Sequence, residues 1–176
     1  MSDRSFPFHD ASTAPANAPV DRVFAYLDDP KALAAHMGES SMMMAGSRMS
    51  IDVDAGAGRV IGSKISMHGS VMGIALSLEE VITERQVPYT KVWQTIGTPN
   101  LLVLAHYRMG FDLTPKGDAS LVRVFIDYSL PARAPASWLG RLLGGAYARW
   151  CTKQMTDGAT RHFDSTKRTD DENQRD

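Results

Sequence analysis

The chain has 176 residues, enough for one ordinary domain with a sizeable core, and 43% of them are apolar. Its 19 Lys and Arg residues balance its 20 Asp and Glu residues, which argues against a nucleic-acid-binding surface or a polybasic membrane anchor. A single cysteine excludes an internal disulfide and any zinc site built from several cysteines.

The first elements in chain order are a short strand and two short helices. The strand is expected over residues 4–13, and the first helix over residues 18–29. Pro19 suits the first turn of this helix, because its missing N–H costs no hydrogen bond there. Pro30 separates the first helix from a second one at residues 31–37, since the residue before a proline disfavours helical geometry.

A series of strands follows, each identified by alternation of apolar and polar residues between turn residues. A long helix with apolar residues four apart closes the chain at residues 135–163, and a polar tail over residues 164–176 is expected to be disordered. The predicted strands are residues 49–53, 60–68, 71–84, 91–96, 101–113 and 121–130. This order predicts an α+β fold, in which a curved antiparallel sheet of about seven strands wraps around the C-terminal helix.

The sequence carries no targeting signal that we recognise. The first ten residues lack the apolar run of a signal peptide, and no segment approaches the roughly 20 apolar residues of a membrane span. We therefore expect a single domain over residues 1–163, located in the cytoplasm, without integral membrane association.

Four stretches resemble a known superfamily. They are APVDRVFAYLDDPKALAAHM at residues 18–37, Val60-Ile61-Gly62, VPYTKVW at residues 87–93, and the hairpin from Phe111 to Val122. Their order is similar to that of the START, birch-pollen-allergen and polyketide-cyclase (SRPBCC) superfamily, in particular its polyketide cyclase/dehydrase-like branch. The resemblance implies a helix-grip fold with a deep apolar cavity between sheet and helix. Members bind lipids, sterols, polyketides or other hydrophobic molecules, and some catalyse cyclisation or aldol chemistry.

Alternation along residues 101–113 and 121–130 decides which side chains face that cavity. It places two tyrosines inward, where each phenol offers a donor and an acceptor. The parity of the strand around Trp93 is ambiguous. The candidate ligand-binding residues are Met67, Trp93, Tyr107, Met109, Phe111, Tyr128, Tyr147 and Trp150. Ordinary core packing is the alternative for every one of them.

Methionine is unusually frequent, with ten residues. Its flexible thioether adapts to irregular space, so an adaptable apolar interior is expected. Met42, Met43 and Met44 form a run beside the predicted cavity mouth, where they are a candidate gate.

No catalytic motif is recognised, and the five histidines lack the spacing of metal ligands, so neither a metal nor another cofactor is predicted. His68 and His106 fall on the polar side of their strands. Glu79 and Glu80 are adjacent in mid-strand, so one of them faces inward if the strand is regular. Any of these groups could act there as a general base. Solvent exposure of the histidines and a bulge at the glutamates are the simpler alternatives.

Three functions remain open from the sequence. The leading one is binding, with or without transport, of a hydrophobic small molecule or lipid. The first alternative is a cyclase-, aldolase- or dehydratase-like enzyme that uses an in-cavity histidine or carboxylate. The second is a protein-contact module with an exposed apolar patch and no large cavity. A homo-oligomer is compatible with each of them.

Overall fold

One antiparallel sheet and one long helix make up most of the structure. The computed structural model describes residues 5–29, 48–71, 74–132 and 136–173. In chain order the elements are β1 (Phe8–Ala16), α1 (Val20–Leu27), β2 (Arg48–Val53), β3 (Lys64–Val71), β4 (Ile74–Gln86), β5 (Thr90–Asn100), β6 (Tyr107–Lys116), β7 (Ala119–Tyr128) and α3 (Ala136–Asn173). The second short helix and the Met42–Met44 run lie outside the described residues.

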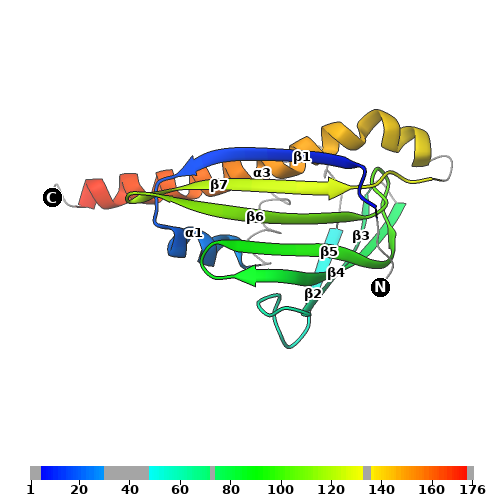
Figure 1. Ribbon diagram of the computed structural model, residues 1–176, viewed down its shortest axis with the longest axis horizontal. Coiled ribbons are helices and arrows are strands. Elements are labelled where there is room, and N and C mark those ends of the chain that lie inside the picture. The colour runs from blue at the N-terminus through cyan, green and yellow to red at the C-terminus, as the bar shows by residue number, and fades with distance from the viewer. Residues whose placement is uncertain (1–4, 30–47, 72–73, 133–135, 174–176) are drawn as a thin grey trace.

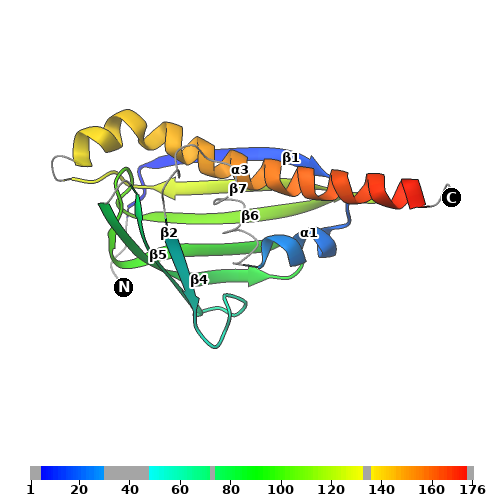
Figure 2. The ribbon, with the colours of Figure 1, turned by 180° about the vertical axis from the view of Figure 1, so that it is seen from behind.

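The sheet has the spatial order β1-β7-β6-β5-β4-β3-β2, and all neighbours are antiparallel. The first strand therefore lies beside the last, with Phe8 opposite Tyr128. Figure 1 views the outer face of the sheet, and Figure 2 shows α3 and α1 against its other face. The expected α+β helix-grip architecture is confirmed, and the hydrophobic core lies between the inner face of the sheet and the two helices.

Helix α1 begins after Pro19, which adopts an extended conformation at the N-cap. Asp21 lies in the first turn, where its charge favours the positive end of the helix. Val23, Phe24 and Leu27 form the buried face. This short helix packs against the inner face of the sheet and is held there by its apolar side.

The segment before β3 differs from the prediction of a strand that begins at Val60. The carboxylate of Asp54 accepts hydrogen bonds from the backbone N–H groups of Gly56 and Lys64, at 3.0 and 2.8 Å, and from the hydroxyl of Ser63. A short acidic side chain that accepts hydrogen bonds from backbone N–H groups stabilises a turn, because those N–H groups are then not available for pairing with a neighbouring strand. The strand therefore starts only at Lys64, and Val60 is exposed.

The ends of other elements also differ from the prediction. The expected turn at residues 97–100 belongs to β5, and residues 101–106 precede β6 without being part of it. Gly69 and Ser70 pair with β4 inside β3, where a turn was expected. Helix α3 continues to Asn173, beyond its predicted end at Phe163.

Polar side chains hold α3 against β1. The hydroxyl of Thr152 donates to the carboxylate of Asp10 at 3.0 Å, and Ser12 and Thr156 share a hydrogen bond of 2.9 Å. Near the start of the helix, a Cβ at Gly144 would lie 2.6 Å from Leu130 Cδ2. The glycine therefore permits the close approach of α3 to the end of β7.

Candidate ligand-binding site

The inner face of β6 carries the apolar residues that alternation predicted, and Trp93 of β5, whose parity was ambiguous, faces the same side. Trp93 on β5 is 7% exposed, Met109 on β6 lies directly opposite it, and Phe111 is fully buried. The rings of Trp93 and Phe111 meet edge to face, with centroids 6.5 Å apart. These three candidate residues belong to the core cluster, and their role in ligand binding stays a prediction.

Tyr107 is positioned by a buried hydroxyl on the neighbouring strand. The β5–β6 ladder ends at the pair of Gln94 and Arg108. Beyond it, the side chain of Thr95 accepts a hydrogen bond from the Tyr107 N–H at 3.1 Å and donates one to the Tyr107 carbonyl at 3.3 Å. Because Thr95 is fully buried, these bonds hold the first residue of β6 in place.

Glu80 is the acidic side chain that the sheet turns inward. Strand β4 is irregular between Ser77 and Glu79 and again between Ile82 and Glu84, but it pairs regularly between these points. Regular alternation therefore places neighbouring glutamates on opposite faces. Glu79 lies 3.5 Å from the ammonium of Lys64, whereas Glu80 is only 3% exposed.

The Glu80 carboxyl accepts hydrogen bonds from two aromatic side chains. The Tyr107 hydroxyl donates to its Oε1, and the Trp93 indole also bonds to it. Burial raises the pKa of Glu80 from its ordinary value of 4.5 to about 7. The two hydrogen bonds and the distant charge of Lys91 act in the opposite direction and lower this pKa, but burial outweighs them. Burial, together with the nearby carboxylate, also raises the pKa of Tyr107 well above its usual range. Tyr107 therefore remains a neutral donor.

Helix α3 contributes the opposite wall. Its Tyr147 and Trp150 rings are tilted to one another with centroids 5.7 Å apart. Burial raises the pKa of Tyr147, which is hydrogen-bonded to Cys151. The Cys151 thiol is itself buried, and desolvation raises its pKa to about 12. It is therefore a neutral thiol at physiological pH.

Several side chains between the sheet and α3 keep accessible surface although they pack against the core. Tyr107 and Tyr147 are both strongly desolvated, yet both are only half-buried by accessible area. The half-buried members of this group are Met67, Tyr107, Tyr147, Trp150 and Met155. These side chains therefore combine contact with the core and solvent-accessible surface.

Tyr128 on β7 lies directly opposite Tyr107 and also packs against the N-terminal strand and α3. Its ring stacks on Phe8 with centroids 5.4 Å apart and lies beneath Gly144 and Gly145 of α3. In the sheet, β6 and β5 separate its strand from that of Glu80. These contacts describe packing between helix and sheet, which was the alternative to a ligand role for this tyrosine.

A lysine also points into the protein, on the α1 side of the sheet. Lys91 is 2% exposed, and its Nζ lies 2.8 Å from Asp28 Oδ1 and 2.9 Å from the Asp28 carbonyl oxygen. Arg85 donates two further bonds to the same carboxylate, at 3.1 and 2.8 Å. Burial alone would raise the pKa of Asp28, but these bonds hold it below its ordinary value. The cluster fastens the C-terminal end of α1 to β4 and β5.

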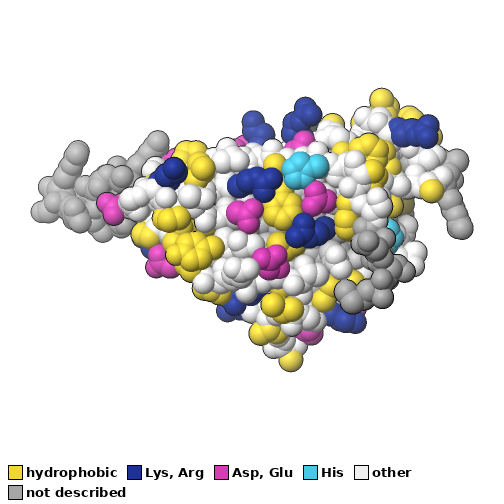
Figure 3. Space-filling model, in the orientation of Figure 1, with side chains coloured by type: hydrophobic (Ala, Val, Ile, Leu, Met, Phe, Trp, Pro, Cys, Tyr) yellow, Lys and Arg dark blue, Asp and Glu magenta, His cyan; other side chains and the backbone are white. Residues whose placement is uncertain are grey.

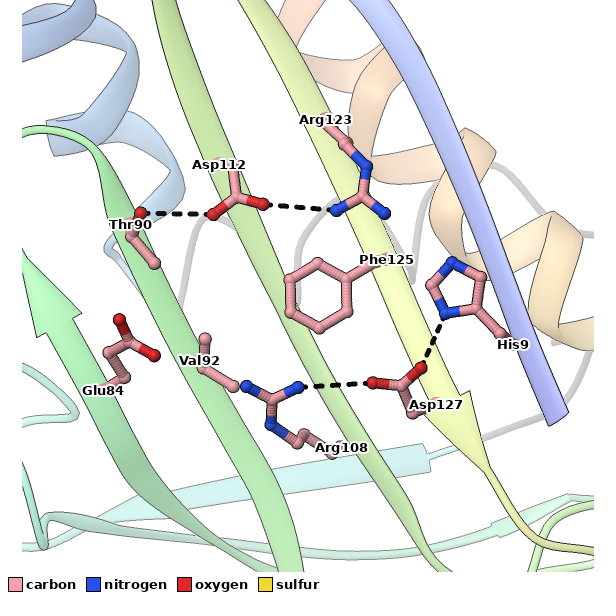
Figure 4. A pocket seen from close by; sticks show the side chains of 9 residues that line it. All are labelled: His9, Glu84, Thr90, Val92, Arg108, Asp112, Arg123, Phe125 and Asp127. Atoms are coloured by element: carbon pink, nitrogen blue, oxygen red, sulfur yellow. Dashed lines mark hydrogen bonds and ion pairs between the residues drawn. The ribbon is translucent and has the colours of Figure 1, made fainter. Parts of the chain in front are cut away.

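The outer face of the sheet carries a shallow pocket of about 360 Å³ (Figure 4). Arg108 and Arg123 cover the Phe125 ring from 5.4 and 5.3 Å, and each is paired with an aspartate. Asp127 binds both Arg108 and His9, at 3.3 and 2.6 Å. Figure 3 shows basic, acidic and histidine side chains gathered together on this face. Because the charges neutralise one another on a solvated face, we assign no ligand to this pocket.

Sequence reasoning left the decisive residues of the interior unassigned. Glu80 was only one member of a pair, and Lys91 was not singled out. Lys91, Trp93 and Thr95 are spaced two residues apart along β5 and therefore face the same side of the sheet. Once Trp93 is known to face inward, this spacing predicts that Lys91 also faces inward. His68 is exposed, and His106 lies 3.4 Å from the Thr95 hydroxyl at the edge of the buried region.

Neither a metal-binding cluster nor a membrane-spanning helix is found in the described part of the chain. Among the residues that the structure describes, no group of three or more His, Cys, Asp and Glu side chains could hold a metal ion. Within the same residues, no helix combines the length and the apolar character needed to cross a bilayer.

Comparison with known proteins identifies the fold. No protein-family model matches the chain, and no curated protein matches it. Among solved structures, a protein of Thermus thermophilus named TTHA0849 matches with a TM-score of 0.66 and 15% identity, over 90% of this chain and 99% of that one. Truncated norcoclaurine synthase from Thalictrum flavum matches with a TM-score of 0.62 and 15% identity, over 88% and 91%. The protein Ara h 8.0201 matches with a TM-score of 0.57 and 12% identity, over 86% and 97%.

These matches and the strand order define the chain as a helix-grip protein. It shares the fold of these three solved structures, which is the helix-grip fold that the sequence motifs indicated. At these identities the likeness establishes the fold, and function has to be argued from the site.

Proposed function

We propose that the protein binds a hydrophobic small molecule or lipid between the inner face of the sheet and α3. The observation that carries the proposal is a set of aromatic and thioether side chains, among them Met67, Tyr107 and Tyr147, that pack against the core and keep accessible surface. Around them the walls are thioether and aromatic groups, which adapt to apolar ligands. The phenols and Glu80 supply the few polar groups that orient a ligand in such a site.

Titration of the delipidated protein with a naphthalene-sulfonate dye tests this function. Met67 and Ser66 are neighbours on β3 and face opposite sides of the sheet, with Leu78 and Glu79 as their respective partners on β4. Met67→Trp fills the proposed site, and we expect it to weaken dye binding at least tenfold. Ser66→Trp is the matched control and should bind as the unchanged protein does. Absence of saturable dye binding to the unchanged protein would refute the proposal.

The inward carboxyl of Glu80 favours a second candidate function, acid–base catalysis on a bound carbonyl compound. With a pKa of about 7, Glu80 can accept a proton at neutral pH from a carbon next to a carbonyl, which leaves a neutral carboxylic acid and an enolate. One protein of this fold is named a synthase, so the fold can support catalysis. Deuterium exchange at the α-carbon of an apolar ketone measures this step. Exchange should be lost in Glu80→Gln and retained in Glu79→Gln.

The remaining alternative, a protein-contact module, would use exposed apolar surface. The first turns of α3 provide some, since Trp138, Leu142 and Leu143 are 58%, 67% and 42% exposed. Dye binding that survives Met67→Trp and is lost when these residues become polar would assign the apolar surface on α3 as the binding site.

A further inference from the structure

Glu80 has hydrogen-bond donors at its carboxyl and, among the described residues, no cation within ion-pairing distance. Tyr107 and Trp93 both donate to it, and each carboxylate oxygen can accept more than one bond. Within the described part of the chain, no Lys, Arg or His side chain lies within 4.0 Å of Glu80. A buried carboxylate in an apolar region is costly unless an opposite charge compensates it.

The other interior charge cannot serve this purpose. Lys91 is bound at 2.8 Å to the carboxylate of Asp28, and it also contacts the Asp28 carbonyl oxygen at the end of α1. Opposite Glu80 on β5 lies Thr95, two positions beyond Trp93 and four beyond Lys91. Among the described residues, the Glu80 carboxylate therefore has no cation within ion-pairing distance, and the charge of Lys91 acts on it only from farther away.

Aromatic side chains lie near the same carboxyl. Trp93 and Tyr107 bond to it directly, Phe111 lies edge-on to Trp93, and Tyr147 is close enough for the Glu80 charge to raise its pKa. Aromatic faces attract organic cations, and the attraction grows when water is excluded. The carboxylate and the rings thus complement one kind of group, a positively charged head on an apolar body.

We propose that Glu80, with Trp93, Tyr107 and Tyr147, binds the protonated amine of a hydrophobic organic amine. This inference rests on the proposed function, because the apolar part of the ligand occupies the space between the sheet and α3. The ammonium donates to the free lone pairs of the Glu80 carboxylate, and the surrounding rings pack against its carbon substituents. A neutral ligand of the same shape would leave the buried carboxylate without a counter-charge.

The bonding pattern favours an amine over a carbonyl compound as the ligand. Trp93 can only donate, and Tyr107 donates through its hydroxyl, so both bonds hold the Glu80 carboxyl as an acceptor. An incoming N–H donor completes this arrangement. An incoming carbonyl oxygen would meet only another acceptor, unless the carboxyl first took up a proton.

Calorimetric titration with two ligands of matched shape tests the inference. The ligands are 1-naphthylmethylamine and 1-naphthalenemethanol, at pH 8, where Glu80 is mostly ionised. We expect the unchanged protein to bind the amine at least tenfold more tightly than the alcohol. Glu80→Gln should bind both with similar affinity, and Glu79→Gln, altered on the opposite face of the same strand, should keep the preference.

The outcomes separate the two proposals. Equal affinities in the unchanged protein, or a preference that persists in Glu80→Gln, would overturn the amine assignment while leaving hydrophobic binding intact. Failure of the alcohol, the amine and the dye to bind would overturn both. An NMR measurement on the unchanged protein needs no variant. At pH 7 the carboxyl-carbon resonance of Glu80 should shift toward the position of the ionised form when the amine is added, and it should not shift when the alcohol is added. An unchanged resonance with saturating amine would also overturn the assignment.

Discussion

The most direct test of the buried Glu80 is the dependence of folding stability on pH. In the folded protein, burial raises the pKa of this carboxyl from 4.5 to about 7. Below pH 4.5 the group is protonated in both the folded and the unfolded chain, so it carries no ionisation penalty. Above pH 7 it is ionised in both, and the folded state bears the cost of a buried charge. Stability should therefore fall as the pH rises through this window.

The size of the effect follows from the change in pKa. One pH unit corresponds to about 1.4 kcal/mol, so a rise from 4.5 to about 7 corresponds to roughly 3 kcal/mol. Glu80→Gln keeps the shape of the side chain and removes the titration. The free energy of unfolding of the unchanged protein, relative to that of Glu80→Gln, should therefore decrease by roughly 3 kcal/mol between pH 4.5 and pH 8.5.

Urea denaturation followed by tryptophan fluorescence over this pH range measures the difference. Groups other than Glu80, such as Asp28, titrate in both proteins, so their contributions cancel in the difference between the two free energies of unfolding. Glu79→Gln alters the neighbouring carboxylate on the solvated face, beside Lys64, and should track the unchanged protein. A difference between the unchanged protein and Glu80→Gln that stays flat from pH 4.5 to 8.5 would refute the buried, desolvated placement of Glu80.

Three further predictions test how the interior is held. Asp28→Asn leaves the buried Lys91 ammonium without its counter-charge and should cost about 3–5 kcal/mol in urea denaturation, and a second change, Lys91→Met, should restore part of the loss. No recovery in the double variant would contradict the ion pair. Gly110→Ala places a Cβ 2.7 Å from the Lys91 carbonyl oxygen and 2.9 Å from the Phe125 ring, so thermal unfolding should reveal a loss of about 1–3 kcal/mol. Phe111→Ala empties a fully buried position and should cost about 3–5 kcal/mol at equilibrium, and a near-neutral result would place Phe111 outside the core.

Local chemistry made much of the fold predictable. Alternation along residues 107–113 and 121–128 reports which side each residue faces, because the pleat turns successive side chains to opposite sides. Met109, Phe111 and Val122 are accordingly buried, and Arg123 lines the outer pocket. The order of strands, short helix and long helix was likewise visible in the changes of hydrophobic period.

Element boundaries were less predictable, since side chains compete with the backbone ladder. The Asp54 carboxylate accepts hydrogen bonds from backbone donors on both sides of the loop, and β3 therefore begins only at Lys64. At Gly97, a positive φ lies within β5 where glycine and proline predicted a turn. In both places the local residue types suit more than one backbone path, and pairing with distant segments selects between them.

What the sequence determined by itself is the α+β architecture, the inward faces of the best-alternating strands and an interior rich in aromatic and thioether groups. What only the tertiary structure decided is which polar groups share that interior. Glu80, Thr95 and Tyr107 come from three neighbouring strands, and Tyr147 comes from the helix opposite them. The pKa of Glu80 depends on the removal of water by residues far away in the chain, so no local pattern could reveal it.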